Sequence, residues 1–265
     1  MPPTLRSADS LRQTLADVIA PLSRLEAELS QRWVLAVDVA RARTRLESGV
    51  VAFEPLETIG AAGDLLVPFV RATVALERAG LISDPEAMQA RERRYQIMPL
   101  IVSWLGGEPA PRDRARAAAR RAAAMIAGSI LRRASALLRA PAAPAGEVGS
   151  RSVERALEEW DRPLCFCCGG APDFALRQGG TRWLVCARCD STWRTSALGC
   201  LGCGAHEAPT IARVTCAALG YQLTICNSCG RYLKEPTEAR PLDPLLERAL
   251  TSELDAAAEA RGLRL

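Results

Sequence analysis

The sequence has a single histidine, His206, and no cysteine at all before residue 165. One histidine leaves few general bases for catalysis. The chain also shows no Ser/His/Asp set, no His-Glu-x-x-His helix and no glycine-rich phosphate loop. These absences argue against the common hydrolytic, metalloprotease and nucleotide-using enzymes, and we expect a binding protein that is not an enzyme.

Long hydrophobic runs are missing as well. No stretch approaches the roughly 20 apolar residues of a membrane span, and the N-terminus MPPTLRSADSLRQ lacks the apolar core of a secretory signal. We therefore expect a soluble cytoplasmic protein. Its 34 basic and 30 acidic residues give a formal net charge of +4, which is too small to indicate nucleic acid on its own.

Composition divides the chain into parts. Residues 140–150, APAAPAGEVGS, have the proline, alanine and glycine content of a linker. The predicted class is α+β, with an all-helical domain over 1–150 that ends in this linker. A tandem four-cysteine metal-ribbon domain over 151–240 and a C-terminal helix over 241–265 complete the expected organisation.

Hydrophobic spacing predicts the helices of the first part. Six apolar residues recur three and four apart and lie on one helical face; they are Leu11, Leu15, Val18, Leu22, Leu25 and Leu29. Pro21 interrupts this face, so we expect a break or a new helix there, with helix continuing to Gly49. A later helix should stop at Gly80, and Ser83 or Asp84 should cap the next one, with Pro85 in its first turn.

An alanine- and arginine-rich helix is expected over Arg112–Arg139. It carries eight arginines and one acidic residue. Such a helix could bind an acidic partner or a membrane surface. The pattern favours instead a solvated helix that packs an Ala/Ile/Leu face inward.

The cysteines carry the strongest signal. All ten lie between residues 165 and 229, and eight form four Cys-x-x-Cys knuckles: Cys165/Cys168, Cys186/Cys189, Cys200/Cys203 and Cys226/Cys229. Two residues between cysteines let both sulfurs reach one ion. Glycine follows three knuckles and Asp190 follows the other, as suits the left-handed backbone of such a turn. In a reducing cytosol, these pairs indicate metal ligands more than disulfides.

Eight thiolates make two tetrahedral sites of four. Seventeen residues separate Cys168 from Cys186, and they read as two strands joined at Gly179-Gly180. The 22 residues between Cys203 and Cys226 contain two further strand-like runs, TIARVT and YQLTI. We expect sequential pairing, although spacing alone leaves an interleaved arrangement open. Sites of four thiolates accept zinc or iron, so two ions per chain of either metal are expected.

Three residues near the knuckles fall outside this scheme. Cys167 sits inside the first knuckle, where its side chain should point away from the ion. Cys216 is expected to be a small buried apolar residue. The thiol of Cys167 or of Cys216 could also be reactive. His206 follows the third knuckle and could substitute as a ligand, but a surface position in the loop fits better with eight cysteines already paired.

The order of these motifs resembles the formate dehydrogenase accessory proteins of the FdhE type. The resemblance lies in CFCCGGAP, RWLVCARCDSTWR, CLGCG and ICNSCGRYLK, and includes Trp193 and the Tyr232–Lys234 stretch after the fourth knuckle. It covers residues 160–263 and is weaker in the helical part. It implies rubredoxin-like sites, with iron as a metal, in a cytoplasmic chaperone-like factor. Such a factor binds the catalytic subunit of formate dehydrogenase and supports its maturation.

Two other functions stay open at this point. Zinc ribbons often serve as structural or nucleic-acid-binding modules, yet these ribbons lack a dense basic run with interleaved aromatics. A thiol or iron redox protein could use Cys-x-x-Cys motifs, but here they come in pairs with no βαβ pattern around them. The sequence leaves the oligomeric state open, a homodimer included.

Overall fold

A computed structural model describes residues 8–108, 111–140 and 147–265. The chain forms two compact units, each of which combines several segments. One contains Met1–Ala16, Arg43–Ala52 and Pro141–Leu265, and the other contains Asp17–Ala42 and Phe53–Ala140. The division into domains over 1–150, 151–240 and 241–265 stays a prediction.

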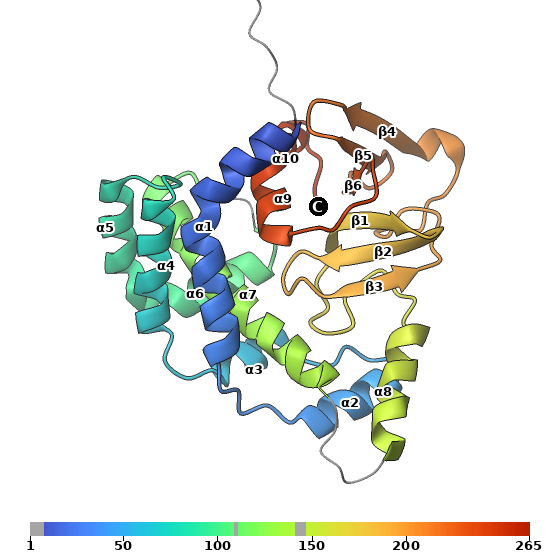
Figure 1. The fold of residues 1–265 in the computed structure, drawn as a ribbon, viewed down its shortest axis with the longest axis horizontal. Helices are drawn as coiled ribbons and strands as arrows, with labels where there is room; N and C mark the ends of the chain where they lie inside the picture. Colours follow the sequence, from blue (N-terminus) through green and yellow to red (C-terminus); the bar gives the residue numbers. More distant parts are fainter. Residues whose placement is uncertain (1–7, 109–110, 141–146) are drawn as a thin grey trace, which may run out of the picture. The chain divides into compact units, whose positions relative to one another are not determined.

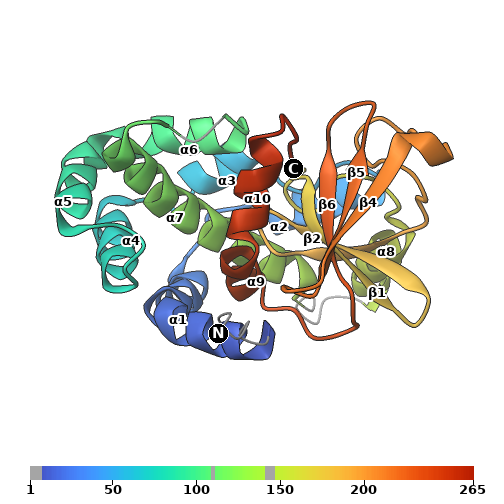
Figure 2. The same cartoon turned by 90° about the horizontal axis from the view of Figure 1, so that it is seen from above.

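The first part of the chain is helical, as predicted. Its elements are α1 Ala8–Arg32, α2 Val39–Glu47, α3 Pro55–Gly60, α4 Leu66–Arg78, α5 Asp84–Glu92, the 3-10 turn η1 Arg93–Gln96, α6 Ile97–Leu105 and α7 Arg114–Arg139. Figure 2 shows α7 lying among α3, α4, α5 and α6. The buried face of α7 is mostly alanine, with Ile126, Ile130 and Leu131 fully buried. Small side chains let neighbouring helices approach closely, so this helix forms the core of its unit.

The arginines of α7 serve this packing. Arg132 forms an ion pair with Glu26 at 3.0 Å, and the Arg133 Nε donates to the Trp33 carbonyl oxygen at 3.2 Å. The predicted inward Ala/Ile/Leu face is confirmed. Arg132 and Arg133 of this basic helix therefore interact with residues of the protein itself.

The predicted helix limits are right in one region and wrong in another. The Glu86 carboxylate accepts the Ser83 backbone N–H at 2.7 Å, as in a capping box, and Gly80 has a φ of +67° after α4. The break at Pro21 is wrong, because α1 continues through it to Arg32. Burial of Ile19, Leu22, Leu25 and Leu29 on one helical face outweighs the missing proline N–H. Residues 33–38 are not helical, contrary to the expected helix to Gly49.

The second part of the chain builds a six-stranded sheet. It contains α8 Glu147–Glu159, β1 Pro172–Gln178, β2 Thr181–Cys186, β3 Thr192–Thr195, the 3-10 turn η2 Ala208–Thr210, β4 Ile211–Cys216, β5 Tyr221–Cys226, β6 Tyr232–Pro236, α9 Pro244–Leu250 and α10 Ser252–Glu259. The strand order is β3-β2-β1-β6-β5-β4 (Figure 1). All neighbouring pairs are antiparallel except β1 and β6. Residues 147–150, expected in the linker, begin α8, and 141–146 lie outside the described residues.

The C-terminal helices pack against this sheet through buried polar contacts. The Lys234 ammonium is fully buried, lies 4.4 Å from the centre of the Phe174 ring and donates to Asp255 at 2.8 Å. The Tyr232 hydroxyl donates to the same carboxylate at 2.7 Å. Tyr232 and Lys234, which carried part of the resemblance, thus hold α10 on the strands. In the described part of the chain, no helix has the length and apolar character needed to cross a membrane.

Candidate metal centres

The four knuckles share one backbone turn. In each, the first cysteine accepts at its carbonyl oxygen from the N–H four residues later, at 2.8 to 3.2 Å. That fourth residue has a positive φ in every case: Gly169 +66°, Asp190 +57°, Gly204 +76° and Gly230 +70°. The left-handed position predicted after each second cysteine is confirmed. Amide N–H groups inside three of the turns point at the first sulfur, at 3.3 to 3.4 Å.

The structure brings the first and second knuckles together into a first quartet. Its four Sγ atoms, from Cys165, Cys168, Cys186 and Cys189, lie within 4.8 Å of one another. The β1–β2 hairpin aligns the two knuckles through the predicted turn at Gly179-Gly180, where both residues have a positive φ. All four cysteines are at most 2% exposed. This quartet lies in the interior of its unit.

The third and fourth knuckles form a second quartet from Cys200, Cys203, Cys226 and Cys229. Here the β4–β5 hairpin joins the two turns. Cys226 is buried, Cys200 and Cys229 are half-buried, and Cys203 is exposed. The sulfurs are therefore grouped sequentially, and the interleaved arrangement is not the one that forms.

Both quartets fit a tetrahedral ion. Metal–sulfur bonds of about 2.3 Å place two ligand sulfurs about 3.8 Å apart. The Sγ atoms of Cys165 and Cys189 are 3.5 Å apart, and those of Cys203 and Cys226 are 3.6 Å apart. The donor set of four thiols excludes the oxygen-seeking ions and suits zinc or iron. Ligation of metal by these eight residues stays a prediction that the geometry permits.

Electrostatics also favour a cation in the first quartet. Burial raises the pKa of the Cys165 and Cys186 thiols well above the usual range of cysteine. Four thiolates in such a site would repel one another and lack solvation. A divalent ion offsets both effects, because it supplies positive charge at the centre of the cluster.

Sequence reasoning missed a residue that supports the first quartet. Arg248 of α9 donates to Asp173 at 2.6 Å, to Asp190 at 2.7 Å and to the carbonyl oxygen of Cys186 at 3.0 Å. The second knuckle is thereby fixed to the C-terminal helices. Asp190 could have indicated such a partner in the sequence. It replaces the glycine found after the other knuckles, and its carboxylate needs a cationic or hydrogen-bonding partner.

The remaining candidates lie outside the quartets. Cys167 is fully buried beside the first quartet without belonging to it, and Cys216 is half-buried at the end of β4. His206 is exposed, and its Nδ1 lies 3.4 Å from the carbonyl oxygen of Gly204. The predicted surface position of His206 is confirmed.

Comparison with known proteins identifies the fold. No family model matches the chain, and no curated protein matches it. Among solved structures, the chain is similar to the FdhE protein from Pseudomonas aeruginosa, with a TM-score of 0.64 and 22% sequence identity. The similarity covers 98% of this chain and 93% of that one. At this identity the likeness establishes a shared fold, and the predicted α+β class with a helical first part and two four-cysteine modules is confirmed. The single C-terminal helix predicted over 241–265 is instead two helices, α9 and α10.

Proposed function

We propose that this protein is an accessory factor of the FdhE type. In this role it binds the catalytic subunit of a formate dehydrogenase in the cytoplasm and supports its assembly or activation. The fold likeness to the Pseudomonas aeruginosa FdhE protein over nearly the whole chain carries the proposal. The ordered sequence match around the four knuckles supports it independently, because that match involves residues and not only topology.

The proposal makes the protein a binder and not an enzyme. Each quartet would hold one ion: Cys165, Cys168, Cys186 and Cys189 the first, and Cys200, Cys203, Cys226 and Cys229 the second. Bound zinc or iron would cross-link two knuckles, and iron would add one-electron chemistry. The chain itself contributes the rigid hairpins, the buried setting and the Arg248 contacts that hold the knuckles in register.

The test is deletion of the gene in its host, followed by a formate dehydrogenase assay and by capture of the catalytic subunit on the tagged protein. We expect activity to fall and the subunit to co-purify. The Cys186→Ser/Cys189→Ser variant should lose capture, because it removes half of the first quartet. Cys216→Ser is the matched control, since this cysteine lies outside both quartets.

Two outcomes would count against the proposal. Full formate dehydrogenase activity in the deletion strain, with no subunit captured, would exclude an accessory role. Capture that is equally weakened by Cys216→Ser would show that the quartets have no special part in binding.

A zinc-loaded protein that binds the subunit but fails to restore its activity would assign the role of the metal to redox chemistry.

A further inference from the structure

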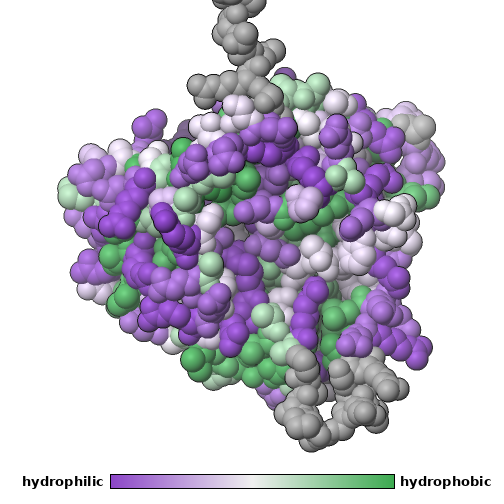
Figure 3. All heavy atoms as spheres, viewed as in Figure 1, coloured by the Kyte–Doolittle hydropathy of each residue, from purple (hydrophilic) through white to green (hydrophobic). Residues whose placement is uncertain are grey.

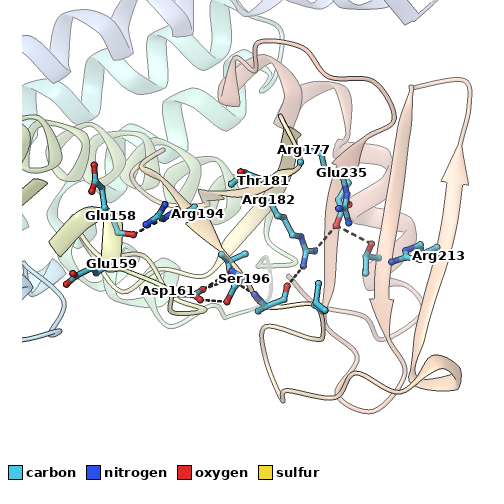
Figure 4. A pocket seen from close by; sticks show the side chains of 15 residues that line it. Glu158, Glu159, Asp161, Arg177, Thr181, Arg182, Arg194, Ser196, Arg213 and Glu235 are labelled. Atoms are coloured by element: carbon cyan, nitrogen blue, oxygen red, sulfur yellow. Dashed lines mark hydrogen bonds and ion pairs between the residues drawn. The ribbon is translucent and has the colours of Figure 1, made fainter. Parts of the chain in front are cut away.

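A polar groove of about 660 Å³ crosses the sheet that carries both quartets. Every strand contributes to its lining; the charged residues are Arg194, Arg182, Arg177, Glu235 and Arg213, with Glu158, Glu159 and Asp161 at one end. Figure 4 shows Arg177 and Arg182 turned toward Glu235, while Arg213 and Arg194 lie to either side. The volume falls within the range of about 300–1,000 Å³ that is common for ligand sites.

Three of the four carboxylates that line this groove already have partners within the protein. Glu235 is 8% exposed and accepts from Arg182 at 2.7 Å and from Thr224 at 3.4 Å. Asp161 accepts from the Thr195 hydroxyl and from the Ser196 backbone N–H. Glu159 forms an ion pair with Arg155 at 2.7 Å. These acids are therefore poorly placed to receive a cationic ligand.

Two arginines keep donors free for a ligand. The Arg177 side chain is 65% exposed, and its Nε lies 3.7 Å from Glu235, which is too long for a hydrogen bond. Arg213 is exposed and has no hydrogen bond or ion pair within the described part of the chain. Arg177 also faces Arg182 directly across the β1–β2 pair, and Glu235, whose carboxylate is bonded to Arg182, only partly offsets this pair of like charges.

The separation of these two arginines indicates the size of the ligand. Arg177 lies on β1 and Arg213 on β4, three strand positions apart in the sheet. At about 4.8 Å per strand this is about 14 Å across the sheet, and the register places Arg213 level with Asp173, about 13 Å along the strand from Arg177. The two backbone positions are therefore about 20 Å apart, the length of about six residues of extended chain. A single small anion is too short to reach both guanidinium groups. Glu235 of β6 lies between these two strands, so a ligand with a negative charge at every position, such as a run of phosphates, would meet its carboxylate, whereas spaced carboxylates need not.

We infer that this groove binds an acidic, extended segment of a protein partner, whose carboxylates contact Arg177 and Arg213. Leu198, which is 94% exposed at the edge of the groove, provides an apolar contact for the same segment. On the face shown in Figure 3, hydrophobic residues lie in patches among hydrophilic ones. The groove itself is lined mostly by charged and polar residues, which favours charge as the basis of recognition. The inference rests on the proposed function in one respect: that function identifies the protein that carries the segment.

The binding test uses the full, metal-loaded chain and a fluorescein-labelled decapeptide of alternating glutamate and serine. Fluorescence anisotropy should show saturable binding that weakens with salt and disappears when glutamine replaces the glutamates. The Arg177→Gln/Arg213→Gln variant should bind about tenfold more weakly, within the range expected for the loss of two exposed ion pairs. Arg114→Gln/Arg116→Gln removes the same charge from exposed positions of α7 and should bind normally.

Several results would overturn the inference. They are no binding of the glutamate peptide, equal loss in both double variants, or tighter binding of a 12-nucleotide RNA than of the peptide. The experiments distinguish a failure of the groove inference from a failure of the proposed function. If the Arg177→Gln/Arg213→Gln variant captures the subunit as well as the unchanged protein does, the groove has no part in the proposed function. Groove-dependent peptide binding without any subunit capture would support the groove and remove formate dehydrogenase as the partner.

Discussion

The two quartets use the same knuckle turn in opposite surroundings. The first has four buried cysteines, with Phe166, Val185 and Trp193 also buried in the same module and Arg248 bonded to its second knuckle. The second has one buried cysteine, and its β4 strand is largely exposed. The local sequence therefore sets the turn, whereas the surrounding fold sets how far each site is shielded from water. This contrast makes the first quartet a structural centre and the second an accessible one.

Removing both ions should have the largest effect. Metal binding free energy contributes directly to the folding of small metal domains, at about 10–16 kcal/mol for zinc in finger peptides. We expect chelation to unfold residues 160–235, while the helical core around Phe69, Ile101 and Ile126 keeps its protection. Hydrogen exchange of the holo and chelated protein measures this. One cooperative loss of all protection would contradict the independent domains predicted from the sequence.

Breaking one quartet at a time should separate the two sites. We expect Cys186→Ser/Cys189→Ser to lose the first ion and most of the sheet, because its site lies in the core. Cys200→Ser/Cys203→Ser should lose the second ion and leave the first hairpin folded. Metal content and thermal unfolding of both variants test the difference, and equal destabilisation would refute it.

Arg248→Ala should destabilise the first quartet without touching a ligand. The substitution leaves Asp173, which is 2% exposed, without its ion-pair partner. Loss of one partner of a buried pair reduces the free energy of unfolding by about 3 kcal/mol. Arg261→Ala, on an exposed arginine after α10, is the control and should change it by less than about 0.5 kcal/mol. Urea denaturation compares the two variants, and a small effect of Arg248→Ala would mean that α9 does not support the knuckle.

The two quartets should also differ in the rate at which they release their metal ions. A chelator reaches an exposed sulfur such as that of Cys203 before it reaches the buried ones. We expect a chromogenic chelator to remove one ion at least about tenfold faster than the other, a barrier difference of about 1.4 kcal/mol. The Cys200→Ser/Cys203→Ser variant should lack the fast phase. Release of both ions in one phase would show that burial does not control access.

Gly204→Ala should have the smallest effect. Gly204 has a φ of +76°, and an added Cβ would meet no atom within 4 Å, so only backbone strain opposes alanine. The expected loss is about 1–2 kcal/mol in the free energy of unfolding. Gly204→Asp should lose less, because Asp190 already adopts this conformation after the second knuckle. Equal losses in the two variants would mean that contacts at the turn, not its φ, decide the cost.

Local patterns were predicted better than long-range ones. The Gly179-Gly180 hairpin, the cap at Ser83 and the four knuckle turns each depend on residues close in sequence. The interpretation failed at Pro21, where a buried helical face outweighs the local preference of proline. It also gave no sign that α10 would pack on the sheet through Lys234, because no sequence motif links a buried lysine to an aspartate of a separate helix.

The sequence by itself determined the knuckles and the cysteine donor set, because two residues between cysteines let both sulfurs reach one ion. It favoured the sequential grouping but left an interleaved one open, and the structure decided between them. Only the tertiary structure decided which quartet is buried and which is open, since burial depends on packing between distant segments. It alone brought Arg248 to Asp190 across 58 residues, and Arg177 and Arg213 onto one groove. Charges far apart along the chain become neighbours only after the strands are ordered in the sheet.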